Sequence, residues 1–90
     1  MRLDVWLHRV CLIKSRSQAK TGCQNGKILL SGAAVKESHS LRPGERITLL
    51  LPHRRIEVQV TAIPEGNVSR KDAAEYYSVI EDVALGPESI

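Results

Sequence analysis

The hydrophobic residues of this chain change their spacing once, near Gly26, and this change limits the folds that the chain can adopt. Before Gly26 they recur every three or four residues, which is the period of an amphipathic α-helix. Over residues 46–62 they alternate with polar residues, which is the period of a β-strand with one buried face. Because the two periods occupy separate parts of the sequence, we expect an α+β domain in which two N-terminal helices pack on a small, mostly antiparallel sheet.

Two short helices are predicted in the first 26 residues. The first has an apolar stripe at positions 3, 6, 7, 10 and 11, which ends at Cys11. The second begins at SRSQ, residues 15–18, a capping box in which the Ser and Gln side chains bond each other's backbone amides. The apolar side of the second helix consists of the small residues Ala19, Gly22 and Cys23, which favour a close approach to the first helix, and Gly26 is expected to end the second.

The middle of the chain is predicted to form hairpins. Residues 28–36 predict a short hairpin that turns at Ser31 and Gly32. The alternating segments 46–51 and 56–62 predict two longer strands joined by a turn.

The end of the chain is predicted to be helical. Residues 71–80, KDAAEYYSVI, have apolar side chains at helical spacing and predict a C-terminal helix, with a frayed tail GPESI after it.

The composition indicates one small globular domain. The chain has 90 residues and no Phe, so its core must be mainly aliphatic. At this length a catalytic domain cannot accompany a binding module, and no nucleophile with its base or phosphate-cradling loop is recognisable, so we do not expect an enzyme. No run of 18 apolar residues and no signal-peptide pattern occurs, which predicts a cytoplasmic protein without membrane contact.

The cysteines and histidines show no metal-binding pattern. Cys11 and Cys23 both fall at apolar positions of predicted helices, so buried free thiols are expected rather than a disulfide framework. His8, His39 and His53 lie in three different elements and share no ligand spacing with the cysteines. No metal or other cofactor is therefore predicted.

Charge is distributed unevenly along the chain. Residues 1–36 contain seven Lys or Arg residues and a single acid, Asp4, whereas residues 65–90 contain two Lys or Arg residues and six acids. A solvated helix face usually mixes charges of both signs, because opposite charges one turn apart stabilise the helix. An ordinary solvated face remains the alternative, but the missing acids favour a polyanion as the partner of the N-terminal part.

The basic residues lie at spacings that suit a phosphate backbone. The first helix carries Arg2 and Arg9, and three further cations line one side of the second helix and its exit. The start of the second helix also presents unpaired amides that favour a phosphate. Structured RNA is favoured as the partner because an A-form duplex displays phosphates and 2′-hydroxyls. A DNA-binding helix-turn-helix is the rival arrangement, but the second helix has few base-reading side chains.

Four segments together resemble the S4 RNA-binding domain in order and spacing. They are MRLDVWL, IKSRSQAK, NGKILLSGAAVK and LRPGERITL, and they cover about residues 1–51. The continuation through SRKDAAEYYSVIEDVALG resembles the short stand-alone members of the family, the heat shock protein 15 and RqcP group. The resemblance implies an S4-type (αL motif) RNA-binding domain over residues 1–63, with its core motif over 1–51, followed by a turn and the C-terminal helix with its frayed tail over 64–90.

The resemblance also implies a function. Members of this group bind large ribosomal subunits that still hold peptidyl-tRNA after a stalled ribosome has split, and they contact ribosomal RNA and the tRNA. In the RqcP branch the protein works with a tRNA-recruiting partner while alanine is added to the C-terminus of the stalled chain. The RNA-binding positions implied here are Arg2, Arg9, Lys14, Arg16, Lys20, Lys27 and Lys36. We therefore expect a non-catalytic, monomeric, cytoplasmic RNA-binding factor.

Other functions stay open at this stage. The same fold supports many RNA targets, so a general structured-RNA binder in ribosome assembly or translation regulation is the main alternative. S4 domains also occur as accessories of pseudouridine synthases and tyrosyl-tRNA synthetases, against which the length argues. A protein-interaction module whose basic face meets an acidic protein is a further possibility.

Overall fold

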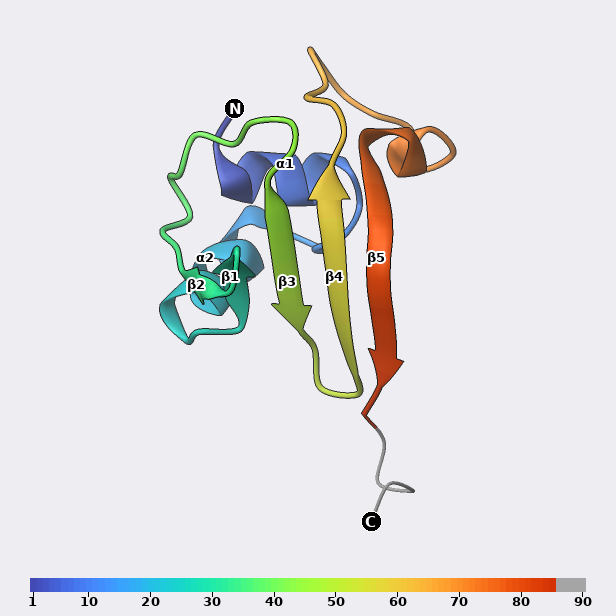
Figure 1. The fold of residues 1–90 in the computed structure, drawn as a ribbon. Helices are drawn as coiled ribbons and strands as arrows, with labels where there is room; N and C mark the ends of the chain where they lie inside the picture. Colours follow the sequence, from blue (N-terminus) through green and yellow to red (C-terminus); the bar gives the residue numbers. More distant parts are fainter. Residues whose placement is uncertain (86–90) are drawn as a thin grey trace.

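The computed structural model describes residues 1–85 and divides them into helices near the N-terminus and a sheet that takes up most of the rest (Figure 1). In chain order the elements are α1 (Leu3–Arg9), α2 (Arg16–Gln24), β1 (Ile28–Leu30), β2 (Ala33–Ala34), β3 (Arg46–Leu50), β4 (Arg54–Val60), the 3-10 helix η1 (Ala73–Tyr76) and β5 (Tyr77–Ala84). The tail GPESI, for which fraying was predicted, lies outside the described residues.

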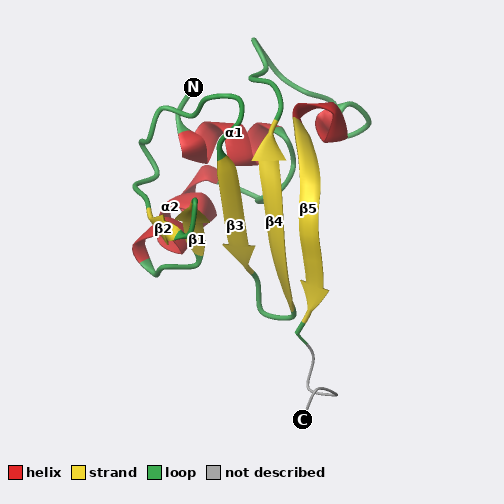
Figure 2. Cartoon of the chain, viewed as in Figure 1, coloured by secondary structure: helices red, strands yellow, loops and turns green. Residues whose placement is uncertain are grey.

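The strands form one antiparallel sheet in the order β2-β1-β3-β4-β5. Both α-helices lie on the same side of this sheet, α1 behind β3 and β4 and α2 behind β1 (Figure 2). The prediction of two N-terminal helices on a small antiparallel sheet is therefore confirmed.

The core lies between the helices and the sheet. Leu3, Trp6 and Leu7 of α1 have no solvent exposure, and buried residues of β3 and β4 complete the core. The largest fully buried side chains are Trp6, Leu3, Leu7, Ile47, Leu49, Val10, Val58 and Val60. Both predicted periods thus point their apolar residues into one aliphatic core that contains a single tryptophan.

The turn between β1 and β2 has the backbone of a type I′ hairpin. Ser31 and Gly32 have φ angles of 50° and 81°, and Leu30 pairs with Ala33 across the turn. A type I′ turn needs positive φ at both central residues because its twist then matches that of the strands. Gly32 adopts this conformation without penalty, whereas at Ser31 the Cβ atom makes the positive φ unfavourable and the backbone is strained.

The predicted C-terminal helix is wrong. Residues 73–76 form only a 3-10 turn, and Tyr77–Ala84 form β5, which pairs with β4 along its whole length. The register shifts between Glu57 and Val58 of β4. Glu57 pairs with Glu81 and Val58 with Val79, so Ile80 has no partner on β4. This extra residue interrupts the period of two, and the spacing then imitates that of a helix.

Gly22 allows a close approach, but to the sheet rather than to α1. A Cβ atom at this position would lie 2.7 Å from Cδ1 of Ile28, the first residue of β1. At Gly22 the predicted close approach to α1 is therefore wrong, and the close contact is between α2 and β1.

Candidate nucleic-acid interface

A buried carboxylate joins the two helices. Asp4, in the first turn of α1, is 3% exposed, and its two oxygens accept hydrogen bonds from Nε and Nη2 of Arg2 at 3.1 and 3.2 Å. Nη2 of Arg16, the first residue of α2, lies 3.6 Å from the same carboxylate, and the Val5 amide donates to it at 2.8 Å. The only acid among the first 36 residues therefore orients two of the predicted RNA-binding arginines.

The N-terminus that carries Arg2 is held by the loop before β3. The Leu3 amide donates to the carbonyl of His39, and the Leu41 amide donates to the carbonyl of Met1, both at 2.8 Å. Arg2 itself forms an isolated β-bridge with Ser40. These bonds fix the backbone of Arg2, while its side chain stays about half exposed.

Half of the predicted capping box is present at the start of α2, because within residues 1–85 the Gln18 side chain makes no return hydrogen bond to the Ser15 amide. The hydroxyl of Ser15 accepts a hydrogen bond from the Gln18 amide at 3.2 Å. Such a cap fixes the first turn of the helix and with it the direction in which Arg16 leaves the backbone.

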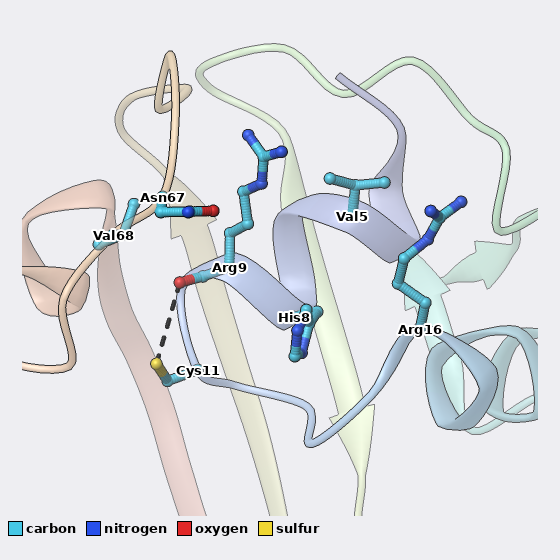
Figure 3. Close-up of a pocket in the computed structure, with 7 residues that line it drawn as sticks. All are labelled: Val5, His8, Arg9, Cys11, Arg16, Asn67 and Val68. Carbon is cyan, nitrogen blue, oxygen red and sulfur yellow. Dashed lines mark hydrogen bonds between the residues drawn. The ribbon is translucent and has the colours of Figure 1, made fainter.

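Two adjoining hollows of about 400 Å³ each lie beside the C-terminal end of α1. They share His8 and Cys11, and we call them together the basic groove. Figure 3 shows the first hollow, where the side chain of Asn67 is directed toward Arg9. The polar side chains that line the groove, besides the Cys11 thiol, are His8, Arg9, Lys14, Arg16, Asn67 and Arg70. No acid lines either hollow in the part of the chain that the structure describes, so the groove suits a polyanion.

The structure gathers some of the predicted site residues and separates others. Arg9, Lys14 and Arg16 line the groove. Arg2 lines neither hollow, but it shares the Asp4 carboxylate with Arg16. Lys20 is exposed one turn further along α2.

Three of the predicted lysines lie outside the groove, and Lys20 is the first of them. Lys27 lines a separate apolar hollow of about 560 Å³ with Leu50 and Leu51, and Lys36 is exposed after β2.

Cys11 was predicted to be buried, and this is wrong. The helical stripe of α1 ends at Val10, and Cys11 follows it with a φ of 62° and an exposed side chain. The left-handed turn lets the next residues fold back, since the amides of Leu12 and Ile13 both donate to the Leu7 carbonyl at 3.1 Å. The thiol therefore faces the groove instead of the core.

Cys23 is buried, as predicted. Burial raises the pKa of its thiol from 9.0 to about 11, with smaller contributions from the carboxylates of Glu37 and Asp4. Cys23 is therefore a neutral core residue at physiological pH, and only Cys11 is an exposed thiol.

Sequence reasoning missed the part of the groove that comes from residues 64–72. This segment reads as a break between elements within an acidic third of the chain, so nothing indicated that Asn67 and Arg70 would lie beside α1. His8 was overlooked as well, because a single histidine on a helix is typical of many structural roles. Over residues 1–85 no group of three or more potential metal ligands gathers, and no helix is long and apolar enough to cross a membrane.

Two helices on one face of a five-stranded antiparallel sheet, with a basic groove at the helix junction, define a small α+β domain of the S4 type. The family described as "S4 domain" matches residues 1–47, and the chain belongs to that family.

Its similarity to known proteins extends over nearly the whole chain. It is 31% identical over 86 residues to the "RQC P-site tRNA stabilizing factor" of Bacillus subtilis, covering 96% of this chain and 99% of the relative. A protein of the same name from Helicobacter pylori is 35% identical over 77 residues, covering 84% of this chain and 92% of the relative. The trimeric structure of Vibrio cholerae heat shock protein 15 matches with a TM-score of 0.82 at 29% identity, covering 88% of this chain and 80% of that one.

Proposed function

We propose that this protein is a non-catalytic RNA-binding factor of ribosome-associated quality control. It binds ribosomal RNA and tRNA on large ribosomal subunits that still carry peptidyl-tRNA, and it supports rescue of the stalled chain or its C-terminal alanine tailing. The observation that carries the proposal is the basic groove at the α1–α2 junction of a chain whose near full-length relatives are named as tRNA stabilizing factors.

The chemistry of the groove supports an RNA backbone as its ligand. Guanidinium groups form bidentate hydrogen bonds with phosphate oxygens. The groove is lined by Arg9, Arg16 and Arg70 together with Lys14. With about 4 to 6 phosphate contacts, log K falls with log salt at a slope of about −0.7 to −0.9 per contact. Binding therefore weakens steeply as salt rises.

The polarised charge supports a defined orientation on the ribosome. The N-terminal helices meet RNA, while the acids of β5 are already paired, Glu81 with Arg55 and Asp82 with Arg54. We propose that the protein acts there as a monomer in the cytoplasm, beside a tRNA-recruiting quality-control protein. Light scattering of the purified protein tests the monomeric state.

The test is sedimentation of the tagged protein from cell lysate on a sucrose gradient. Lys14→Ala/Lys20→Ala removes two exposed cations, Lys14 in the groove and Lys20 on α2, and neither forms an ion pair within residues 1–85. Arg42→Ala/Arg46→Ala is the control with the same charge change outside both the helices and the groove. Wild-type and control proteins are expected in large-subunit fractions that carry peptidyl-tRNA, and the lysine variant is expected at the top.

Two results would contradict the proposal. Wild-type protein that stays at the top of the gradient at low salt is not bound to ribosomal subunits, and sedimentation with another structured RNA would indicate the general RNA binder instead. For alanine tailing, mass spectrometry of a stalled reporter chain from cells without the gene should show fewer C-terminal alanines. An unchanged tail would limit the role to rescue without tailing.

A further inference from the structure

Residues 64–72 lie far from α1 in sequence but form one wall of the basic groove. Asn67 and Val68 line the first hollow with Arg9 (Figure 3). Arg70 lines the second hollow together with Lys14. This segment follows β4 and lies outside residues 1–47, which match the S4 domain. The groove therefore has a wall that the S4 motif does not supply.

The segment is held at its first end by α1 and by η1. The indole nitrogen of Trp6, which is fully buried, donates to the carbonyl of Ala62 at 3.2 Å. The amide of Thr61 donates to the carbonyl of Tyr76 at 3.0 Å, and its hydroxyl donates to the carbonyl of Glu75 at 3.1 Å.

The second end of the segment is a closed turn. The Asp72 amide donates to the Ser69 carbonyl at 3.0 Å, and the hydroxyl of Ser69 lies 3.0 Å from the Asp72 carboxylate. Ala73, which follows, is buried in the core. Arg70 therefore projects from a short turn that is anchored on both sides.

Arg70 is available for an anion although it lies in the acidic third of the chain. Within residues 1–85 it forms no ion pair, and the nearest acid in sequence, Asp72, is hydrogen-bonded to the Ser69 hydroxyl. A guanidinium group that faces other cations across a groove raises the local positive potential and favours a phosphate between them.

We propose that Arg70 is a second-wall RNA contact, which binds a backbone phosphate of the strand that passes between this segment and α1. Asn67 supports it, since its amide can donate to the same strand beside Arg9. The inference rests on the proposed function for the class of ligand. It extends the RNA-binding surface beyond the two helices to the segment 64–72, which forms the second wall of the groove.

The test compares single substitutions in a binding titration with deacylated tRNA at several salt concentrations. Arg70→Ala is expected to weaken binding by roughly tenfold and to reduce the slope of log K against log salt by about 0.7 to 0.9, the value of one phosphate contact. Arg46→Ala, an exposed arginine on β3 outside the groove, is the matched control and should leave the slope unchanged. Arg70→Lys should retain much of the affinity, and equal melting temperatures show that every variant folds.

The outcomes separate this inference from the proposed function. If Lys14→Ala weakens binding but Arg70→Ala behaves like Arg46→Ala, the second wall is not an RNA contact, while the helix side of the groove still is. If the wild-type protein shows no salt-dependent binding of tRNA, this inference is overturned. The proposed function is overturned as well if the protein also stays at the top of the sucrose gradient at low salt.

Discussion

Asp4 of α1 and Arg16 of α2 form an ion pair across the helix junction, with 3.6 Å between the carboxylate oxygen and Nη2. The carboxylate also holds Arg2 with two hydrogen bonds. Both arginines are about half exposed, so they can reach a ligand while a buried charge fixes where they point. A substitution of either arginine therefore changes folding as well as binding.

Removing both arginines should destabilise the protein. Arg2→Ala/Arg16→Ala leaves the Asp4 carboxylate buried with only the Val5 amide as a partner, and we expect a loss of about 3 kcal/mol in the free energy of unfolding. Urea denaturation measures this loss. Adding Asp4→Asn to the double variant should restore part of it, because no buried charge is then left unpaired.

The matched control for this prediction is Lys14→Ala/Lys20→Ala. Both lysines are exposed and unpaired within the described residues, so stability should change by less than about 0.5 kcal/mol. Equal stability of the arginine and lysine variants would mean that water already reaches Asp4. In that event Arg16 would contribute as little to folding as an isolated surface cation does.

Local sequence patterns predicted the two N-terminal helices, the Ser15 cap of the second and the alternation of β3 and β4, since each depends on neighbouring residues. The Ser15 cap and the buried stripe of α1 follow from spacing alone. The ion pairs of Asp4 and the groove wall around Arg70 depend on which elements meet in space, and spacing cannot show this. The same limit explains why Tyr77–Ala84, whose alternation a register shift interrupts, was taken for a helix.

Ser31→Asn should stabilise the β1–β2 hairpin. Ser31 has a φ of 50°, and Asn tolerates this left-handed conformation better than Ser does. We expect a gain of about 0.5 to 1 kcal/mol in the free energy of unfolding, measured by urea denaturation. Ser31→Val is the opposite control, because a β-branched side chain is disfavoured at positive φ. Equal stability of the two variants would argue against a type I′ turn.

Trp6→Phe should loosen the segment that carries Arg70. The change keeps an aromatic side chain in the core but leaves the Ala62 carbonyl without the indole donor, at a cost of about 1 to 3 kcal/mol. Relative to the wild type, Trp6→Phe should increase the hydrogen-exchange rate of amides in residues 61–72 more than that of amides in β3. A uniform change over the whole chain would instead indicate a general loss of core packing around Tyr77, whose ring lies 6.3 Å from that of Trp6.

The two cysteines should react at very different rates with a thiol reagent at neutral pH. Cys11 is exposed beside the groove, whereas Cys23 is buried and its thiol has a raised pKa of about 11. Titration of the native protein should therefore label one thiol rapidly, and Cys11→Ser should abolish this fast phase with little change in stability. Fast labelling of Cys11→Ser would show that the core around Cys23 opens readily.

Cys23 should also make stability depend on pH in the alkaline range. Its pKa is raised from 9.0 to about 11 in the folded state, so between these values the unfolded chain loses a proton that the folded protein keeps. The stability contributed by the neutral thiol is complete below pH 9 and declines as the pH rises toward 11. Urea denaturation of wild type and Cys23→Ala over this range measures the effect, since other titrating groups are common to both proteins. The free energy of unfolding should fall more steeply with pH in the wild type, and parallel curves would mean that the buried thiol ionises as easily as it does in the unfolded chain.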